Sequence, residues 1–202
     1  TLNYPEKLNA FNNEMLAAWA ARLAECRDRD DIRVIIVTGA GRGFCSGGDT
    51  GNMGSSDKTS PRQAKDNLQS TVHPIALTLA TIDKPVICAL NGVAAGAGLD
   101  MALHCDIRYA AASARFAETY TRVGLVPGNG AAWTLPRTVG VQKALEMLWT
   151  ADFVNAEEAK RIGLVLDVFP DETFRDDVMA IAKKIAKNAP ISVRYIKRLV
   201  YQ

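Results

Sequence analysis

Two short apolar runs, each followed at once by a turn that contains glycine, constrain the fold of this sequence most strongly. Residues 33–38 (RVIIVT) end at Gly39, and residues 85–90 (PVICAL) end at Asn91-Gly92. Apolar, β-branched runs of this length are typical of strands that are buried on both faces, as in parallel sheets covered by helices. The sequence therefore predicts an α/β fold in which a loop of small residues follows each strand.

Segments with helical periodicity lie between these predicted strands and continue to residue 200. We expect a third strand at residues 106–110, so that three strand-turn units belong to one sheet system. From Val141 onward the pattern is helical, which favours a core over residues 1–140 and a helical C-terminal region over residues 141–202. Helices are predicted at residues 9–27, 67–81, 99–104, 142–149, 156–161, 171–188 and 191–200.

Composition and spacing argue against several kinds of function. The 24 basic and 22 acidic residues are mixed along the 202 residues, which disfavours nucleic acid as a partner. The four cysteines and two histidines are too widely spaced for a zinc or iron site, so we interpret them as structural residues in a reducing compartment. No apolar stretch reaches the roughly 18 residues needed to cross a bilayer. We expect no metal, no membrane partner and a cytoplasmic location, or the mitochondrial matrix in a eukaryote.

The first informative segment covers residues 39–49 (GAGRGFCSGGD), directly after a predicted strand. Its small residues let the backbone approach a ligand closely and aim amide N–H groups at an anion or a carbonyl oxygen. The segment completes neither a dinucleotide fingerprint nor a P-loop, and Ser46 lacks the preceding glycine of a nucleophile elbow. On spacing alone, a tight structural turn is an equal alternative. Residues 51–61, rich in glycine and serine, predict a mobile surface loop beside it.

The second segment covers residues 91–103 (NGVAAGAGLDMAL) and opens a helix after the next strand. Small residues at a helix N-terminus leave free amides where the helix dipole favours negative charge. Two such loops at neighbouring strand ends can supply two N–H donors to one oxygen. In acyl-transfer enzymes each donor of this kind is worth about 3 to 4 kcal/mol, so the pattern indicates oxyanion stabilisation.

Taken in order, the motifs resemble those of the crotonase (enoyl-CoA hydratase/isomerase) superfamily. The resemblance runs from residues 2–10 to residues 196–199. It implies a spiral ββα core that binds acyl-CoA over residues 1–140, and a helical region over residues 141–202 that covers the pocket and supports oligomerisation. It also implies an acyl-CoA thioester partner, with coenzyme A as part of the substrate and no other cofactor, and a homotrimer or dimer of trimers. Family members usually extend further at both ends, so we expect a longer natural chain. The motifs are FCSGGD (44–49), KPVICALNG (84–92), AGAGLD (95–100), CDI (105–107), ARF (114–116) and GLVPG (124–128).

The resemblance also implies roles for individual residues. The oxyanion-hole amides fall on Gly48 and Ala97. Residues around Cys45 resemble those that contact the adenine end of coenzyme A, and the later ones line or support the acyl pocket. The full set expected to bind the substrate is Cys45, Ser46, Gly47, Asp49, Gly96, Gly128, Asn129 and Trp133.

Two acidic positions of the hydratase pattern map to Asp100 and Tyr120. Tyr120 puts a phenol of reference pKa about 10 where the pattern has a glutamate, and such a group is a poor general base at neutral pH. Glu118 lies two residues earlier, so it shares the face of Tyr120 in an extended segment and points away if a helix has begun. We expect Asp100 to move the proton, with Glu118 or Tyr120 assisting.

Hydration of a 2-enoyl-CoA and isomerisation of an enoyl-CoA both stay open. A single competent carboxylate favours isomerisation, whereas the overall motifs are similar to those of hydratases. A non-catalytic acyl-CoA-binding relative would keep the glycine loops and lack the acid–base groups. A further alternative is another crotonase reaction, such as thioester hydrolysis or decarboxylation, on the same oxyanion site.

Overall fold

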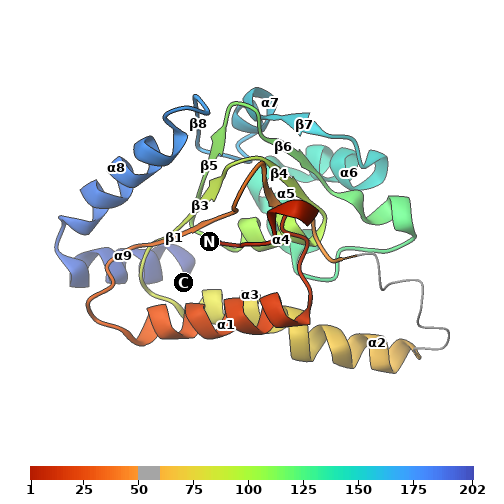
Figure 1. Cartoon of the computed structure of the whole chain (residues 1–202), viewed down its shortest axis with the longest axis horizontal. Helices are drawn as coiled ribbons and strands as arrows, with labels where there is room; N and C mark the ends of the chain where they lie inside the picture. Colours follow the sequence, from red (N-terminus) through yellow and green to blue (C-terminus); the bar gives the residue numbers. More distant parts are fainter. Residues whose placement is uncertain (50–59) are drawn as a thin grey trace.

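The computed structural model describes residues 1–49 and 60–202, whose strands form two sheets of mainly parallel pairs (Figure 1). The predicted loop at residues 51–61 lies largely outside the described residues. Only one pair, in the second sheet, is antiparallel among those described. The first sheet has the order β1 (Ile35–Thr38), β3 (Val86–Leu90), β5 (Ile107–Ala111) and β8 (Asp167–Phe169), and the second has β2 (Gly43–Cys45), β4 (Val93–Ala95), β6 (Arg115–Ala117) and β7 (Val154–Asn155).

The chain spirals by alternating between the sheets. Strands β1, β3 and β5 each lead through a short turn into β2, β4 and β6 of the other sheet. After β2 and β4, helices return the chain to the first sheet; after β6 the chain passes through two α-helices to β7 of the second sheet, and a further α-helix then leads to β8 of the first. This repeat is the predicted ββα spiral. The three predicted strands are β1, β3 and β5, and they lie in one sheet as expected. The second sheet was not predicted, because β2, β4 and β6 have only three residues each and show no periodicity of their own.

The helices cover the sheets from several sides (Figure 1). The predicted helix at residues 9–27 begins later because Leu8 and Asn9 adopt left-handed backbone angles (φ 52° and 56°) and the Asn12 side chain caps the helix at Met15 N. None of the helices among the described residues combines the length and apolarity of a bilayer span. The α-helices are α1 (Asn13–Asp28), α2 (Pro61–Asn67), α3 (His73–Thr81), α4 (Ala97–Leu103), α5 (Ala131–Val139), α6 (Val141–Thr150), α7 (Ala156–Arg161), α8 (Phe174–Ala186) and α9 (Pro190–Tyr201).

The predicted helix at residues 67–81 contains a π-helical turn, Leu68–Val72, between α2 and α3. The C-terminal region contains its four predicted helices, and it also contributes β7 and β8, which complete the two sheets. Ala144 and Met147 of α6 belong to the main core cluster. The division at residue 140 stays a prediction.

The main core brings the start of α4 against the end of β2. Phe44, Leu99 and Phe116 are fully buried there. Gly98 of α4 lies so close to β2 that a Cβ at this position would collide with the carbonyl oxygen of Cys45. This close approach sets the two glycine-rich loops side by side.

Candidate active site

The first of the two predicted oxyanion amides belongs to Gly48. The carbonyl of Gly47 accepts a hydrogen bond from Phe11 N at 2.8 Å. In a trans peptide the next N–H points opposite to that carbonyl, so the Gly48 N–H points away from Phe11. Among the described residues no acceptor for this N–H is present.

The second amide belongs to Ala97, the first residue of α4. The Gly96 carbonyl accepts hydrogen bonds from Leu99 N at 2.8 Å and Asp100 N at 3.0 Å, so the Ala97 N–H of the same peptide points out of the helix. It too has no acceptor within the part of the chain that the structure describes.

The two amides belong to adjoining loops. A Cβ placed on Gly47, whose φ is +95°, would lie 3.0 Å from the carbonyl oxygen of Ala95 and 3.6 Å from Ala97 N. Only glycine adopts this backbone geometry and this close approach without strain. Gly48 and Ala97 remain partly exposed while Gly47 is buried. The two N–H groups therefore belong to partly exposed residues of adjoining loops, an arrangement that suits an oxyanion hole.

A cluster of three titratable side chains follows the second loop. The Tyr120 hydroxyl donates a hydrogen bond to Oδ2 of Asp100 at 2.6 Å. Asp100 and Glu118 are both fully buried. Because Asp100 stands at the fourth position of α4, one turn after Ala97 begins the helix, the cluster lies beside the free amides.

The local backbone explains how Glu118 and Tyr120 both face Asp100. Strand β6 ends at Ala117, and a 3-10 helix, Thr119–Val123, begins directly after Glu118. Glu118 itself has φ −95° and ψ 86°, which is neither strand nor helix. The two alternatives drawn from the sequence, a shared face or opposite directions, therefore do not describe this junction.

The structure leaves several polar atoms of the site without partners. Within residues 1–49 and 60–202, the buried side-chain oxygens that lack a hydrogen bond belong to Asp100, Glu118 and Asn129. A buried polar group without a partner costs free energy, and such groups are rare in proteins. Their gathering at one place indicates a site built to meet a ligand. The atoms are Oδ1 of Asp100, Oε1 and Oε2 of Glu118, and Oδ1 of Asn129.

Burial separates the acidities of the two carboxyl groups. It raises the pKa of Asp100 to about 6, against the opposing effect of the hydrogen bond from Tyr120. Burial and the neighbouring Asp100 charge raise the pKa of Glu118 to about 10. Burial also raises the pKa of Tyr120 well above its usual range. At neutral pH, Asp100 is ionised while Glu118 and Tyr120 carry their protons.

Comparison with known proteins decides the family. The enoyl-CoA hydratase/isomerase family matches the chain over residues 1–202. The chain belongs to this family. It is 40% identical over 203 residues to the 1,2-epoxyphenylacetyl-CoA isomerase of Escherichia coli, and the aligned residues cover 99% of this chain and 76% of that protein. It is 39% identical over 199 residues to the (E)-benzylidenesuccinyl-CoA hydratase of Thauera aromatica, with 98% and 76% covered. The structure of an enoyl-CoA hydratase from Bacillus anthracis matches with a TM-score of 0.88 and 34% identity, over 98% of this chain and 75% of that one.

As an enoyl-CoA hydratase/isomerase, the protein acts on a coenzyme A thioester. The loop that follows its 3-10 helix also reaches the site. Asn129 is 4% exposed, and its side-chain Nδ2 lies 3.2 Å from Sδ of Met101 in α4. His73 and His104 donate hydrogen bonds to the carbonyls of Gly128 and Asn129. Asn129 is thus joined to α4, the helix that carries Asp100, whereas Gly128 is joined to α3.

Other predicted substrate contacts of the enoyl-CoA hydratase/isomerase lie at the edge of the site. The Cys45 thiol is fully buried, and burial raises its pKa to about 12. The Ser46 hydroxyl donates to the carbonyl of Lys7 at 3.2 Å, and Asp49 forms an ion pair with Lys7 at 2.7 Å. Cys45 is buried as a whole, with its carbonyl oxygen against Gly98 of α4, so its contact with the substrate stays a prediction.

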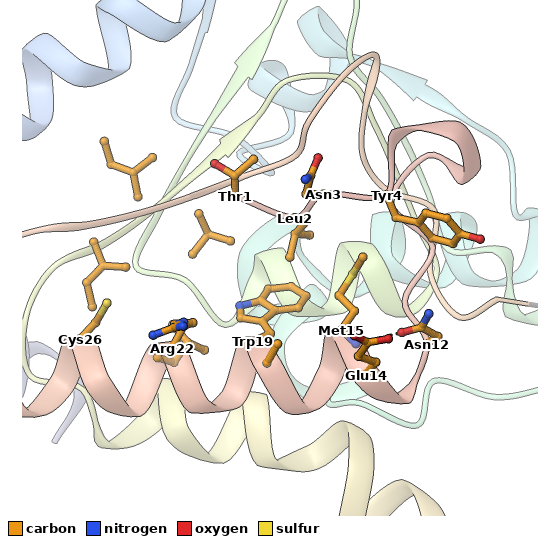
Figure 2. A pocket seen from close by; sticks show the side chains of 15 residues that line it. Thr1, Leu2, Asn3, Tyr4, Asn12, Glu14, Met15, Trp19, Arg22 and Cys26 are labelled. Atoms are coloured by element: carbon orange, nitrogen blue, oxygen red, sulfur yellow. Dashed lines mark hydrogen bonds between the residues drawn. The ribbon is translucent and has the colours of Figure 1, made fainter.

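Trp133 lies apart from the carboxyl cluster. It is 65% exposed, and the Arg137 guanidinium stacks on its ring at 3.0 Å from the centroid. It lines a cavity of about 510 Å³ together with α9 residues, and Asp100 is not among the residues that line this cavity. A second cavity, of about 600 Å³, lies between the N-terminal segment and α1, where Met15 and Trp19 point toward Leu2 (Figure 2). It contains none of the predicted site residues.

Reasoning from sequence did not assign His73, His104 or Thr119 to the site. A Cβ on Gly96 would lie 3.0 Å from Oγ1 of Thr119, so this threonine packs against the second glycine loop. His104 follows Asp100 by four residues on a predicted helix, and this spacing places both on one face. That spacing was the available signal for His104, whereas His73 lies far from the site in sequence.

Proposed function

We propose that this enzyme moves the double bond of an enoyl-CoA thioester, with Asp100 as the base. The supporting observation is the separation of the two acidities. With a pKa of about 6 for Asp100 and about 10 for Glu118, the site holds one carboxylate and one carboxylic acid at neutral pH. Pairs of groups whose environments push their pKa values apart supply the acid and the base of a reaction.

In the proposed reaction, the thioester oxygen of a 3-enoyl-CoA accepts hydrogen bonds from Gly48 and Ala97. Asp100 removes a proton from C2, and the electron pair of that C–H bond moves into an enolate conjugated with the double bond. A proton is then delivered to C4 by Asp100, or by Glu118 with the proton restored from Asp100. The product is the 2-enoyl-CoA. Each oxyanion donor contributes about 3 to 4 kcal/mol to the stability of the enolate.

Hydration is the second candidate, and the placement of Glu118 favours it. In hydration, the ionised carboxylate takes a proton from a water molecule as its oxygen adds to C3 of the enoyl group. The protonated carboxyl group then gives a proton to C2. Glu118 supplies the second carboxyl group although Tyr120 occupies the expected glutamate position. The relative from Thauera aromatica is named a hydratase, whereas the relative from Escherichia coli is named an isomerase.

Product analysis separates these candidates. Purified enzyme is given 3-enoyl-CoA and 2-enoyl-CoA of short and medium length in D₂O, and products are followed by mass spectrometry. Isomerisation predicts 2-enoyl-CoA from 3-enoyl-CoA, with deuterium entering carbon positions. Accumulation of 3-hydroxyacyl-CoA from 2-enoyl-CoA while 3-enoyl-CoA stays unchanged contradicts the isomerase proposal and supports hydration, and free coenzyme A or loss of CO₂ supports another crotonase reaction.

The Asp100→Asn variant tests the assigned base. Turnover should fall by at least about 10²-fold, the lower end of the contribution of a general base. Binding of the CoA ester, measured by calorimetry, should change little. Exposed Asp152→Asn serves as the control, since this side chain is 79% accessible. Full activity in Asp100→Asn would remove Asp100 from the mechanism, and binding without turnover in the unmodified enzyme would favour a binding relative.

We also propose a homotrimer or dimer of trimers in a reducing compartment such as the cytoplasm, with coenzyme A entering only as part of the substrate. Support for assembly comes from large apolar side chains that α5 and α6 expose. Support for the compartment comes from the four free thiols. Light scattering after size exclusion should give three or six times the mass of one chain. The exposed apolar residues are Trp133, Val141, Leu145 and Trp149.

A further inference from the structure

Thr119 is the first residue of the 3-10 helix that follows β6. The next two side chains of this helix have partners, since the Tyr120 hydroxyl donates to Asp100 and the Thr121 hydroxyl donates to the Leu148 carbonyl at 3.2 Å. The Thr119 hydroxyl has no hydrogen-bond partner among the described residues, and the residue is partly exposed. This hydroxyl is therefore available to a ligand.

The Thr119 hydroxyl adjoins the peptide that carries the Ala97 amide. A Cβ placed on Gly96 would lie 3.0 Å from Oγ1 of Thr119, and no other atom of the described chain beyond its two neighbours would lie within 4 Å of it. With ψ −127° at Gly96, this Cβ would nearly eclipse Ala97 N about the Cα–C bond. In the trans peptide the Ala97 N–H points to the same side, because it lies opposite to the Gly96 carbonyl. The Ala97 N–H and the Cβ direction that leads to Thr119 therefore run nearly parallel.

The first glycine loop approaches the same amide from another direction. A Cβ on Gly47 would lie 3.6 Å from Ala97 N. The Ala97 N–H itself has no acceptor in the part of the chain that the structure describes. The space that this N–H faces is thus bordered by the loop that carries the Gly48 amide and by the Thr119 hydroxyl.

Local structure does not account for the Thr119 hydroxyl. Threonine hydroxyl groups in and beside helices commonly bond to nearby backbone. In α5, Thr134 and Thr138 each donate to the carbonyl four residues earlier. Thr119 makes no such bond within the described residues, so its hydroxyl neither caps nor staples its own helix.

We propose that the Thr119 hydroxyl is a third hydrogen-bond donor to the thioester oxygen, beside the amides of Gly48 and Ala97. A hydroxyl donates one hydrogen bond, and an oxygen that gains negative charge accepts shorter and stronger bonds than a neutral carbonyl. The third donor therefore stabilises the enolate more than the bound substrate, which raises kcat. The inference rests on the oxyanion hole of the proposed function, but not on which carbon atom receives the proton.

Infrared spectroscopy of a bound thioester tests this inference without turnover. The probe is [1-¹³C]butanoyl-CoA, a saturated thioester that can be neither isomerised nor hydrated, at a saturating concentration set by calorimetry. A hydrogen bond to a carbonyl lowers its stretching frequency, so Thr119→Val should raise the frequency of the bound carbonyl, whereas Thr119→Ser should leave it close to that in the unmodified enzyme. Thr121→Val, on the same 3-10 helix, is the matched control. An unchanged frequency in Thr119→Val, or an equal rise in Thr121→Val, overturns the inference.

Turnover of an enoyl-CoA gives a second readout. Thr119→Val should lower kcat by about 10²-fold, the lower end of the loss for one oxyanion donor, and should change KM much less. Thr119→Ser keeps the donor and should retain most of the turnover. Thr119→Ala also removes the hydroxyl and replaces Thr119→Val in both measurements if the valine variant fails to fold. An equal loss of kcat in the serine and valine variants contradicts the inference.

The two measurements separate this inference from the proposed function. If Thr119→Val raises the carbonyl frequency in an enzyme that forms 3-hydroxyacyl-CoA, the third donor stands and the isomerase proposal fails. If isomerisation depends on Asp100 while the frequency does not respond to Thr119→Val, the isomerase proposal stands and the third donor is overturned.

Discussion

The hydroxyl of Tyr120 lies 2.6 Å from Oδ2 of Asp100, and this contact gives a tyrosine a role at a position where the family pattern has a glutamate. A third carboxylate beside Asp100 and Glu118 would add like charge to a buried site. The phenol stays neutral and donates a proton to the hydrogen bond instead. It therefore stabilises the ionised form of Asp100 without competing for protons at neutral pH.

The Tyr120→Phe variant should reveal this effect in the pH dependence of turnover. Loss of the donor removes an interaction that lowers the pKa of Asp100, so this pKa should rise above about 6. A hydrogen bond to a charged group is worth about 1.5 to 3 kcal/mol, which corresponds to about one to two pH units. The acidic limb of kcat/KM should move upward by that amount. Tyr195→Phe, on exposed α9, is the matched control, and an unmoved limb would remove Tyr120 from the control of Asp100.

At the residue scale the sequence predicted the members of the cluster better than their orientations. Asp100 and Tyr120 were selected from their motif positions and Glu118 from its spacing to Tyr120, and the structure brings the three together. The direction of Glu118 depends on backbone angles at the junction of β6 and the 3-10 helix. No side-chain pattern over two residues encodes such a junction, because both strand and helix periodicity end there. His73 contributes through a tertiary contact that local sequence does not contain.

Among the elements, α4 is the one whose packing sets the site. Gly98 lets this helix approach β2 so closely that the Ala97 amide adjoins the Gly47 loop. The three-residue strands that make the second sheet were not predicted, since runs so short carry no alternation. Their positions follow instead from pairing with each other, as in the register of Ala94 with Phe116.

Replacing Gly98 with alanine should disrupt the site through this packing. The added methyl group collides with the Cys45 carbonyl, and backbone cannot move aside as a flexible side chain can. We expect a loss of about 2 kcal/mol or more in the free energy of unfolding, since overpacking typically costs 1 to 3. Turnover should fall as Ala97 moves away from Gly48. Urea unfolding and enoyl-CoA turnover measure the two effects.

Gly128→Ala is the matched stability control for this substitution. A Cβ there would meet Leu68 at 3.6 Å, an ordinary contact, and its backbone angles need no glycine. If the Gly98→Ala and Gly128→Ala variants have the same urea midpoint of unfolding, the packing of α4 does not depend on its close approach to β2 at Gly98.

At the scale of the whole molecule, the spiral of repeated units explains why the sequence predicts the fold well. The sequence predicts the site only in part. Buried strands followed by loops of small residues recur along the chain, and each repeat predicts the same local unit. The site combines Gly48, Ala97, Glu118 and Asn129 from successive segments of the chain, and their convergence follows from the alternation of the chain between two sheets of mainly parallel strands. Sequence motifs located these loops, but only the tertiary structure shows the two histidines behind the Asn129 loop.

Burial of the protonated Glu118 should make the stability of the whole molecule depend on pH. Its pKa is about 10 in the folded protein, against an ordinary value of 4.5. Between these values the folded state holds a proton that the unfolded state has released, so the free energy of unfolding falls as pH rises. One such proton corresponds to about 1.4 kcal/mol per pH unit. Glu118→Gln cannot ionise and should lose this dependence, becoming more stable than the unmodified protein at pH 9. Urea unfolding of both proteins from pH 6 to pH 9 measures the difference, and parallel curves would show that Glu118 is ionised in the folded state.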